Sequence, residues 1–233
     1  MARLEHLASL GLDLNGKSVL EVGAGIGLLT SFFEDRQCTV VSTDGNVRNV
    51  EENKRRHPKR NVRLLNLESK GAMDTLSGLG QFDIIFCYGV LYHLSKPGEA
   101  LKALAAVCRE MILLETCVAL RNYAELHLLR DPEASDQTIS GIGCRPSRPW
   151  IMDTLKRYFG FAYITSTQPK HPDFPTDWRI LPTQLVYRSV FVGSKRPLLN
   201  KNLLTEIPEH QTRSCGRPHP KKWLRSFAYG KLI

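Results

Sequence analysis

The segment K-S-V-L-E-V-G-A-G-I-G, residues 17–27, places a glycine-rich turn directly after a short apolar run. Residues 18–22 predict a buried strand, with the carboxylate of Glu21 near its end. The glycines of the turn are Gly23, Gly25 and Gly27, and their bare backbone can approach a ligand closely. A second apolar run, T-V-V-S-T-D, ends at Asp44, whose carboxylate can accept hydrogen bonds from both hydroxyls of a ribose. Together these features predict a site for a nucleoside-containing cofactor.

The spacing of the glycines indicates the kind of cofactor. A dinucleotide fingerprint is G-x-G-x-x-G, in which the third glycine follows the second by three residues. Leu28 stands at that position, and the chain instead has G-x-G-x-G after a glutamate. This arrangement resembles motif I of the class I S-adenosylmethionine-dependent methyltransferases. The resemblance implies S-adenosylmethionine as the cofactor.

Alternating strand and helix patterns predict an α/β fold. Seven strands are expected, near residues 18–22, 39–43, 62–68, 82–88, 111–117, 161–167 and 184–193. Helices are expected before the first strand and near residues 28–33, 47–56, 97–108 and 150–159. The family resemblance implies a Rossmann-like seven-stranded sheet whose last strand is antiparallel to the rest, with helices on both faces.

At 233 residues, with 42% hydrophobic and 24% charged residues, the chain suits one soluble domain. No apolar run approaches the ~20 residues of a membrane span, and the first residues lack the apolar stretch of a signal peptide. Six cysteines lie without any C-x-x-C spacing, which disfavours a zinc site and a disulfide framework. We therefore expect a cytoplasmic protein with reduced thiols, no membrane contact and no bound metal.

Positive charge is concentrated at the C-terminal end of the chain. Residues 194–233 carry nine Lys or Arg against two Glu, a net of +7 within a whole-chain charge of +9. We therefore expect a nearly neutral domain over residues 1–193 and a basic extension over residues 194–233. Basic extensions favour polyanions such as RNA, and Trp223, Phe227 and Tyr229 can stack on bases. The alternatives are a solvated extension, or aromatic side chains that dock on the domain.

The ends of the strands carry the candidate contacts, because ligands of open α/β sheets bind beyond the carboxyl ends of the strands. Leu67 and Glu68 end the third expected strand, where a backbone amide and a carboxylate suit the edge of an adenine ring. Glu68 is equally well explained as a carboxylate at a helix N-terminus. The residues expected to contact the cofactor are Glu21, Gly23, Ala24, Gly25, Gly27, Asp44, Leu67, Glu68 and Cys87.

The sequence after the fourth expected strand carries a more specific resemblance. It reads G-V-L-Y-H-L-x-x-P at residues 89–97, with A-L-x-x-L at 100–104 and L-L-E-T at 113–116. This combination resembles the class I branch that contains the tRNA wobble-uridine carboxymethyltransferases and their uncharacterised relatives. The resemblance implies that Tyr92 lies near the transferred group. Those enzymes contact a carboxylated cofactor through a sizeable N-terminal extension, which the short segment before the first strand does not provide, so ordinary S-adenosylmethionine is expected.

The sulfonium of S-adenosylmethionine already activates the methyl group, so the protein mainly aligns a nucleophile and removes its proton. Tyr92 and His93 are the catalytic candidates, because they follow the fourth strand and histidine titrates near neutral pH. A structural role for His93, bonded to backbone at a helix start, stays open. Two acceptor chemistries are excluded: the chain has no [NDS]-P-P-[FYW] loop for exocyclic amines and no Pro-Cys pair for cytosine C5.

Two long segments without clear periodicity, residues 118–150 and 169–182, are expected to cover the acceptor. Their candidate contacts are Arg121, Tyr123, His127, Arg130, Arg145, Arg148, Trp150, His171, Asp173, Asp177 and Trp178. Such groups suit a polyhydroxylated acceptor, although the same residues can simply pin the loops. The leading hypothesis is an O-directed methyltransferase for a small molecule or saccharide. The alternatives are an RNA methyltransferase, a binding subunit without activity and, least favoured, a nicotinamide dehydrogenase.

Overall fold

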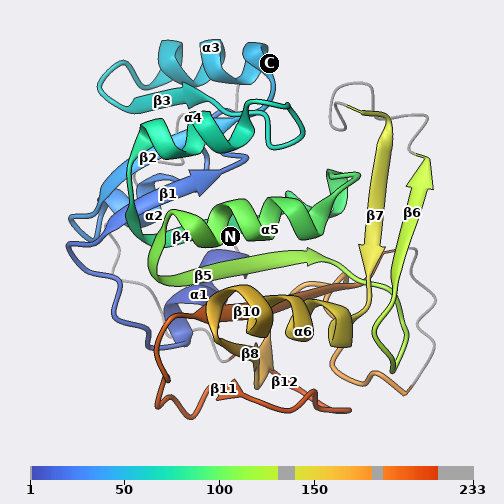
Figure 1. The fold of residues 1–233 in the computed structure, drawn as a ribbon. Coiled ribbons are helices and arrows are strands. Elements are labelled where there is room, and N and C mark those ends of the chain that lie inside the picture. Colours follow the sequence, from blue (N-terminus) through green and yellow to red (C-terminus); the bar gives the residue numbers. More distant parts are fainter. Residues whose placement is uncertain (1, 131–139, 180–185, 215–233) are drawn as a thin grey trace.

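The computed structural model describes residues 2–130, 140–179 and 186–214, and its centre is one mixed sheet (Figure 1). The strands of this sheet lie in the order β11-β8-β10-β5-β4-β1-β2-β3. They are β1 (Ser18–Val22), β2 (Thr39–Asp44), β3 (Asn61–Leu64), β4 (Phe82–Tyr88), β5 (Cys108–Cys117), β8 (Phe161–Thr165), β10 (Arg188–Ser194) and β11 (Leu203–Leu204). The strands from β3 to β5 are parallel, whereas β10 is antiparallel to both β5 and β8. The predicted Rossmann-like sheet is confirmed, with the short β11 added at one edge.

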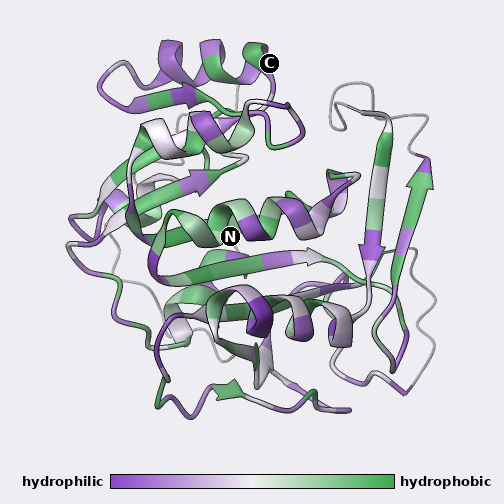
Figure 2. Cartoon of the chain, in the orientation of Figure 1, coloured by the Kyte–Doolittle hydropathy of each residue, from purple (hydrophilic) through white to green (hydrophobic). Residues whose placement is uncertain are grey.

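Helices cover both faces of this sheet (Figure 1). They are α1 (Ala2–Ser9), α2 (Ser31–Glu34), α3 (Val47–Arg56), α4 (Ala72–Leu79), η1 (Leu91–His93), α5 (Pro97–Ala106) and α6 (Arg148–Phe159). Successive residues of β4 point to opposite faces: Phe86 packs in the core under α1 and α2, and Ile85 packs in the core under α4, α5 and α6. Figure 2 shows hydrophobic residues along β4 and β5 and a mostly hydrophilic α3. These two cores hold the carboxyl ends of β1, β2 and β4 together at one edge.

Two elements near this edge are shorter than the sequence pattern predicts. β3 ends at Leu64 because the chain turns at Asn66, whose side-chain oxygen accepts a hydrogen bond from the backbone nitrogen of Glu68 at 2.9 Å. Leu67 and Glu68 therefore lie on a turn beyond the strand. The helix expected after the glycine turn is reduced to the four residues of α2, and α4 was not predicted.

The first segment that was expected to lack regular structure contains a β-hairpin. β6 (Leu126–Arg130) pairs antiparallel with β7 (Ile142–Pro146), and Figure 1 shows this pair beside the main sheet. The expectation for residues 118–150 is wrong here, because the short strands hold no sustained alternation that a sequence pattern would reveal. Gly143 of β7 packs so closely on η1 that a Cβ would lie 2.6 Å from the carbonyl oxygen of Tyr92.

The folded domain continues past residue 193, where the sequence suggested its end. β11 pairs with β8, and β12 (Thr212–Arg213) pairs with β9 (Thr167–Gln168). Gln211, just before β12, is buried and accepts a hydrogen bond from Trp178 Nε1 at 2.7 Å. The boundary expected at residue 193 is therefore corrected, because the following residues complete the edge of the sheet.

Residues 195–214 thus belong to the domain rather than to a basic extension. The rest of that expected extension, with Trp223, Phe227 and Tyr229, lies outside the described residues. Among the helices of the described ranges, none is long and apolar enough to cross a membrane.

Candidate functional site

The glycine turn after β1 has a backbone that glycine adopts far more readily than other residues. Gly23, Gly25 and Gly27 all have positive φ, at 69°, 54° and 85°. A Cβ on Gly23 would lie 2.2 Å from Cγ2 of Val90, so this glycine lets the turn press against the loop after β4. A Cβ on Gly25 would meet no atom within 4 Å, because Gly25 faces open space. The turn therefore leaves room for a ligand at its middle glycine.

Asp44, at the end of β2, is fixed beside this turn. Its Oδ2 accepts a hydrogen bond from the backbone nitrogen of Gly25 at 2.8 Å. Its Oδ1 accepts hydrogen bonds from the backbone nitrogen of Asn46 at 2.9 Å and from Nδ2 of Asn49 at 3.1 Å. Two carboxylate oxygens offer about four lone pairs in all, so Asp44 retains capacity to accept from a ligand.

A cavity of about 240 Å³ opens beside Asp44, and we call it the Asp44 cavity. Besides Asp44, its lining includes Gly23, Gly25, Leu67, Glu68 and His93. These residues come from the ends of β1, β2 and β4 and from the turn after β3. The structure therefore brings together one group of residues that the sequence predicted for the cofactor.

Glu68 is held in this cavity by the loop after β4. Its Oε1 accepts hydrogen bonds from the backbone nitrogen of Ser95 at 2.6 Å and from the hydroxyl of Ser95. No side chain caps the N-terminus of α4, so Glu68 does not serve as the helix cap. Its Oε2 is buried and has no hydrogen-bond partner among the described residues. A buried carboxylate oxygen of this kind fits a ligand that donates a hydrogen bond.

A second cavity of about 680 Å³ lies on the other side of the glycine turn, and we call it the Tyr92 cavity. Its lining includes Arg3, Ala24, Tyr92, His171, Asp173 and Arg188. It shares Gly23, Gly25, Asn49 and Gly89 with the Asp44 cavity. The two cavities therefore meet at the glycine turn, and the larger one has the size of a small-molecule site.

A network of charged side chains forms the wall of the Tyr92 cavity. Glu115 of β5 is completely buried, with Oε2 at 3.1 Å from Nη1 of Arg3 and Oε1 at 2.9 Å from Nη1 of Arg188. Arg188 also donates from Nη2 to the phenolic oxygen of Tyr92 at 3.1 Å, and its Nε lies 3.6 Å from Oδ2 of Asp173. Five separate parts of the chain thus meet at this wall.

The network sets the protonation states of its members. Burial alone would lower the pKa of Arg188, but the charge of Glu115 raises it, and the net pKa lies above its ordinary value. Burial raises the pKa of Tyr92, although Arg188 opposes this effect. Tyr92 is therefore an uncharged phenol at neutral pH, and its oxygen already accepts the hydrogen bond from Arg188. Its O–H remains able to donate to a ligand.

Comparison with known protein families identifies the class of this fold. A family model described as a methyltransferase domain matches residues 2–162, which is more than half of the chain. The chain belongs to this methyltransferase family. The predicted methyltransferase is therefore confirmed, whereas the match does not single out the wobble-uridine branch. Among curated protein sequences, no relative matches.

Several solved structures share the fold of this methyltransferase. The N-terminal domain of EvdMO1, solved with S-adenosylhomocysteine and D-fucose, aligns with a TM-score of 0.62 and 21% identity over 84% of this chain and 82% of that one. A 1,6-didemethyltoxoflavin-N1-methyltransferase from Burkholderia thailandensis aligns with a TM-score of 0.52 and 18% identity. The alignment covers 84% of this chain and 77% of that one. Magnesium protoporphyrin IX methyltransferase from Synechocystis PCC 6803, solved with S-adenosylmethionine, aligns with a TM-score of 0.53 and 15% identity. The alignment covers 84% of this chain and 77% of that one. The cofactors of these structures agree with the predicted one.

The two predicted catalytic residues of this methyltransferase lie in different cavities. Tyr92 lines the Tyr92 cavity, whereas His93 lines the Asp44 cavity. They are neighbours in η1, and their rings are in contact, with centroids 4.0 Å apart. The imidazole that lines the same cavity as Tyr92 is that of His171, from the loop after β9.

Three residues predicted for the cofactor of this methyltransferase line neither cavity. Glu21 is buried under the turn, where its Oε2 accepts from the hydroxyls of Thr30 at 2.6 Å and Ser42 at 2.9 Å. Burial raises the pKa of Glu21. Burial in the core also raises the pKa of Cys87, to about 12. A Cβ on Gly27 would lie 2.6 Å from the side chain of Asn53. All three shape the turn and the strands beneath it.

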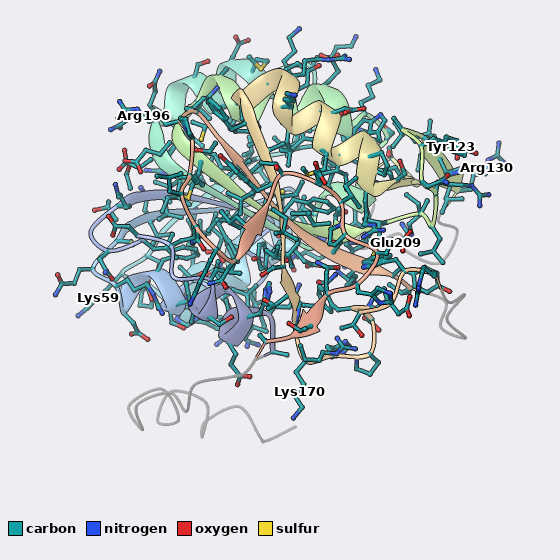
Figure 3. The ribbon with its side chains drawn as sticks, turned by 90° about the horizontal axis from the view of Figure 1, so that it is seen from below. Lys59, Tyr123, Arg130, Lys170, Arg196 and Glu209 are labelled. Carbon is teal, nitrogen blue, oxygen red and sulfur yellow. The ribbon has the colours of Figure 1, made fainter. Side chains whose placement is uncertain are left out.

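The two acceptor segments of this methyltransferase contribute unequally. In the first, Arg121, Tyr123, His127, Arg130, Arg145, Arg148 and Trp150 line neither cavity. Figure 3 shows Tyr123 and Arg130 directed away from the body of the molecule. In the second, His171 and Asp173 line the Tyr92 cavity, and Arg213 holds this loop by donating to the carbonyl oxygens of Pro169 and His171 at 2.7 and 3.0 Å and to that of Phe174. Of the eleven predicted contacts, His171 and Asp173 therefore line a cavity, and residues 131–139 and 180–182 of the two segments lie outside the described residues.

Arg3, Glu115 and Arg188 were not predicted from the sequence. The one available signal was Glu115, a single carboxylate within the apolar run L-L-E-T, which requires a buried partner. Its partners, Arg3 and Arg188, lie 112 and 73 residues away in the sequence, so no local pattern reveals them. Within the described ranges, no group of three or more His, Cys, Asp or Glu side chains is arranged to hold a metal ion.

Proposed function

We propose that this methyltransferase binds S-adenosylmethionine across the glycine turn and methylates a hydroxyl oxygen of a small molecule or saccharide. The observation that carries this proposal is the meeting of the two cavities at Gly23, Gly25 and Gly89. The nucleoside of the cofactor fits the Asp44 cavity, and the acceptor fits the Tyr92 cavity. The methyl group would then lie where the two cavities join.

The residues of the Asp44 cavity fit the nucleoside. Asp44 retains acceptor capacity for one ribose hydroxyl beside its three protein donors, and its bond to Gly25 couples it to the turn. The buried Oε2 of Glu68 can accept from the amino group of an adenine. Gly25 leaves open space where any side chain would intrude. These features support the cofactor assignment independently of the family match.

The protein's own part in the reaction is to hold and deprotonate the acceptor. When bound, S-adenosylmethionine supplies a methyl group that its sulfonium already activates for transfer. Tyr92 donates its phenolic hydrogen to the acceptor and so fixes its position. His171 lines the same cavity and can receive the proton that the acceptor hydroxyl releases, while Asp173 can accept a hydrogen bond from the acceptor.

Two neighbours of the fold support a small acceptor. EvdMO1 was solved in the presence of D-fucose, and the Burkholderia enzyme was solved with 1,6-didemethyltoxoflavin. The Tyr92 cavity combines a phenol, a carboxylate, an imidazole and two guanidinium groups, which suits a polar acceptor of that size.

The test is transfer from methyl-labelled S-adenosylmethionine into an extract separated into RNA, protein, and glycan plus small-molecule pools. Label in the glycan plus small-molecule pool supports the proposal. Label in RNA or protein alone contradicts its acceptor class. Binding of S-adenosylhomocysteine without transfer to any pool favours a binding subunit instead.

The alternative acceptor is RNA, held by the basic residues after position 193. Four of those nine residues lie in the described part of the chain, and two of the four, Lys195 and Arg213, donate to backbone carbonyl groups of the domain. The remaining five follow residue 214. A truncation after residue 214 therefore tests this alternative without cutting into the sheet. Salt-dependent RNA binding that disappears on this truncation would favour it.

A further inference from the structure

Arg188 joins the two polar groups of the Tyr92 cavity that are best placed to recognise an acceptor. Its Nη2 donates to the phenolic oxygen of Tyr92 at 3.1 Å, and its Nε lies 3.6 Å from the carboxylate of Asp173. Its backbone nitrogen also donates to the carbonyl oxygen of Asp173 at 2.7 Å. One planar guanidinium, anchored by the buried Glu115, thus holds both side chains on the same wall.

This arrangement gives the two groups opposite roles in hydrogen bonding. The phenolic oxygen of Tyr92 accepts from Arg188, so its O–H is directed elsewhere and can donate to a ligand. The ionised carboxylate of Asp173 can only accept. The wall therefore presents one donor and one acceptor side by side. A pair of neighbouring hydroxyl groups, one accepting and one donating, matches this pattern.

The charges of the wall favour an uncharged acceptor. Arg3 and Arg188 share the completely buried carboxylate of Glu115. Arg3 and Asp173, each with a side chain that is 36% exposed, present one charge of each sign to the cavity. The two guanidinium groups of the wall balance its two carboxylates, so the wall has no excess charge for an ionic acceptor, and an apolar acceptor would leave the phenol and the carboxylate without partners.

We propose that Tyr92 and Asp173 bind two neighbouring hydroxyl groups of an uncharged polyhydroxylated acceptor, and that Arg188 is a positioning residue that acts through them. This inference rests on the proposed function and names the acceptor class of the same site. Specificity for the acceptor then comes from the contact between Arg188 of β10 and Tyr92 of η1, and not from the hairpin of β6 and β7.

The first test fractionates the labelled product by charge. The extract is incubated with methyl-labelled S-adenosylmethionine and the wild-type protein, and the products are separated into neutral water-soluble, anionic, cationic and organic-phase fractions. The inference predicts label in the neutral water-soluble fraction. Label confined to the anionic, cationic or organic fraction overturns it while leaving the methyltransferase assignment intact. Absence of both transfer and S-adenosylhomocysteine binding overturns the proposed function, and this inference with it.

The second test compares variants on the labelled product. Tyr92→Phe should lower kcat/KM for the acceptor about 3- to 10-fold and Asp173→Asn about 10-fold or more, as expected for losing a neutral and a charged hydrogen bond. Both should act mainly through the acceptor KM and leave the Kd of S-adenosylhomocysteine unchanged. Tyr123→Phe and Asp153→Asn are matched controls, because neither residue lines the cavity, and both should behave as wild type.

The positioning role of Arg188 has its own readout. Arg188→Lys keeps the charge beside Glu115 but loses the planar fork that reaches Tyr92. It should raise the acceptor KM about 10-fold in the wild-type background, and much less when Tyr92→Phe and Asp173→Asn are both present, because Arg188 acts through these two side chains. An undiminished effect of Arg188→Lys in that double variant, or an unchanged acceptor KM in Tyr92→Phe and Asp173→Asn, overturns the inference.

Discussion

The backbone nitrogen of Gly25 donates a hydrogen bond of 2.8 Å to Oδ2 of Asp44, and this bond links the glycine turn to the end of β2. Gly25 faces open space, whereas Gly23 in the same turn presses against Val90. The two glycines therefore serve different purposes. Gly25 keeps the site open, and Gly23 allows the turn to pack on the loop after β4.

Alanine substitutions should separate these purposes. Gly25→Ala places a methyl group into the open space at a cost to folding of about 1–2 kcal/mol for the positive φ, and should abolish S-adenosylhomocysteine binding in a folded protein. Gly23→Ala adds the clash with Val90 to the same backbone cost. It should therefore destabilise the fold clearly more than Gly25→Ala does. Urea unfolding and calorimetry measure both effects. Gly78→Ala, in α4 where a Cβ meets nothing, is the control, and equal destabilisation by all three would contradict this explanation.

Removing the carboxylate of Glu115 should destabilise the protein strongly. Glu115→Ala leaves the half-buried Arg188 without its buried partner, and breaking such a pair costs about 3–5 kcal/mol. The free energy of unfolding in urea measures this loss. Glu51→Ala, an exposed site on α3, should change it by no more than about 0.5 kcal/mol. A similar small change for Glu115→Ala would show that the network contributes little to stability.

The buried His6 should make the protein less stable in mild acid. It is 0% exposed, its Nε2 donates to the carbonyl oxygen of Thr167 at 2.9 Å, and burial lowers its pKa from 6.5 to about 4. Between these two values the unfolded chain binds a proton that the folded chain rejects, so stability falls as the pH drops from 6.5 toward 4. The full effect is on the order of 3 kcal/mol.

His6→Gln removes this titration and keeps a donor for Thr167. The difference in unfolding free energy between pH 7 and pH 4.5 should therefore be smaller in His6→Gln than in the wild type. An identical pH dependence of the two proteins would show that His6 does not titrate in this way.

Arg213 should control the order of the acceptor loop without affecting the cofactor. Its guanidinium donates to three carbonyl oxygens of the loop that carries His171 and Asp173. Arg213→Ala should speed hydrogen exchange over residues 169–178 and raise the acceptor KM several-fold, because losing the charge-assisted hydrogen bonding of its Nη1 costs about 1.5–3 kcal/mol. The Kd of S-adenosylhomocysteine should stay unchanged. Lys201→Ala, at an exposed position, is the control, and unchanged exchange in Arg213→Ala would refute the loop assignment.

Local patterns explain which parts of the fold and site could be predicted from the sequence. The strand, the glycine turn and Asp44 lie within 28 consecutive residues, so their order and residue types already describe the site. The strands of the sheet followed from apolar runs, and the antiparallel last strand followed from the family resemblance. The hairpin escaped prediction because β6 and β7 are short and lack alternation.

Contacts between distant residues explain what could not be predicted. Tyr92 and His93 are adjacent in sequence and their rings are in contact, yet each lines a different cavity. The ion pair between Arg3 and Glu115 depends on α1 packing across the end of the sheet, which no local pattern encodes. The basic residues near position 200 suggested an extension by charge alone, yet Arg213 bonds to the acceptor loop.

The most direct test of this account is a calorimetric titration of the wild type and of Asp44→Ala with S-adenosylhomocysteine. We expect one site per wild-type chain and at least about a 10- to 100-fold weaker Kd for Asp44→Ala, because charge-assisted hydrogen bonds contribute about 1.5–3 kcal/mol. Asp153→Ala, an exposed site on α6, should bind as the wild type does. Equal affinity of Asp44→Ala and the wild type, or no binding to either, would contradict the assignment of the Asp44 cavity to the cofactor.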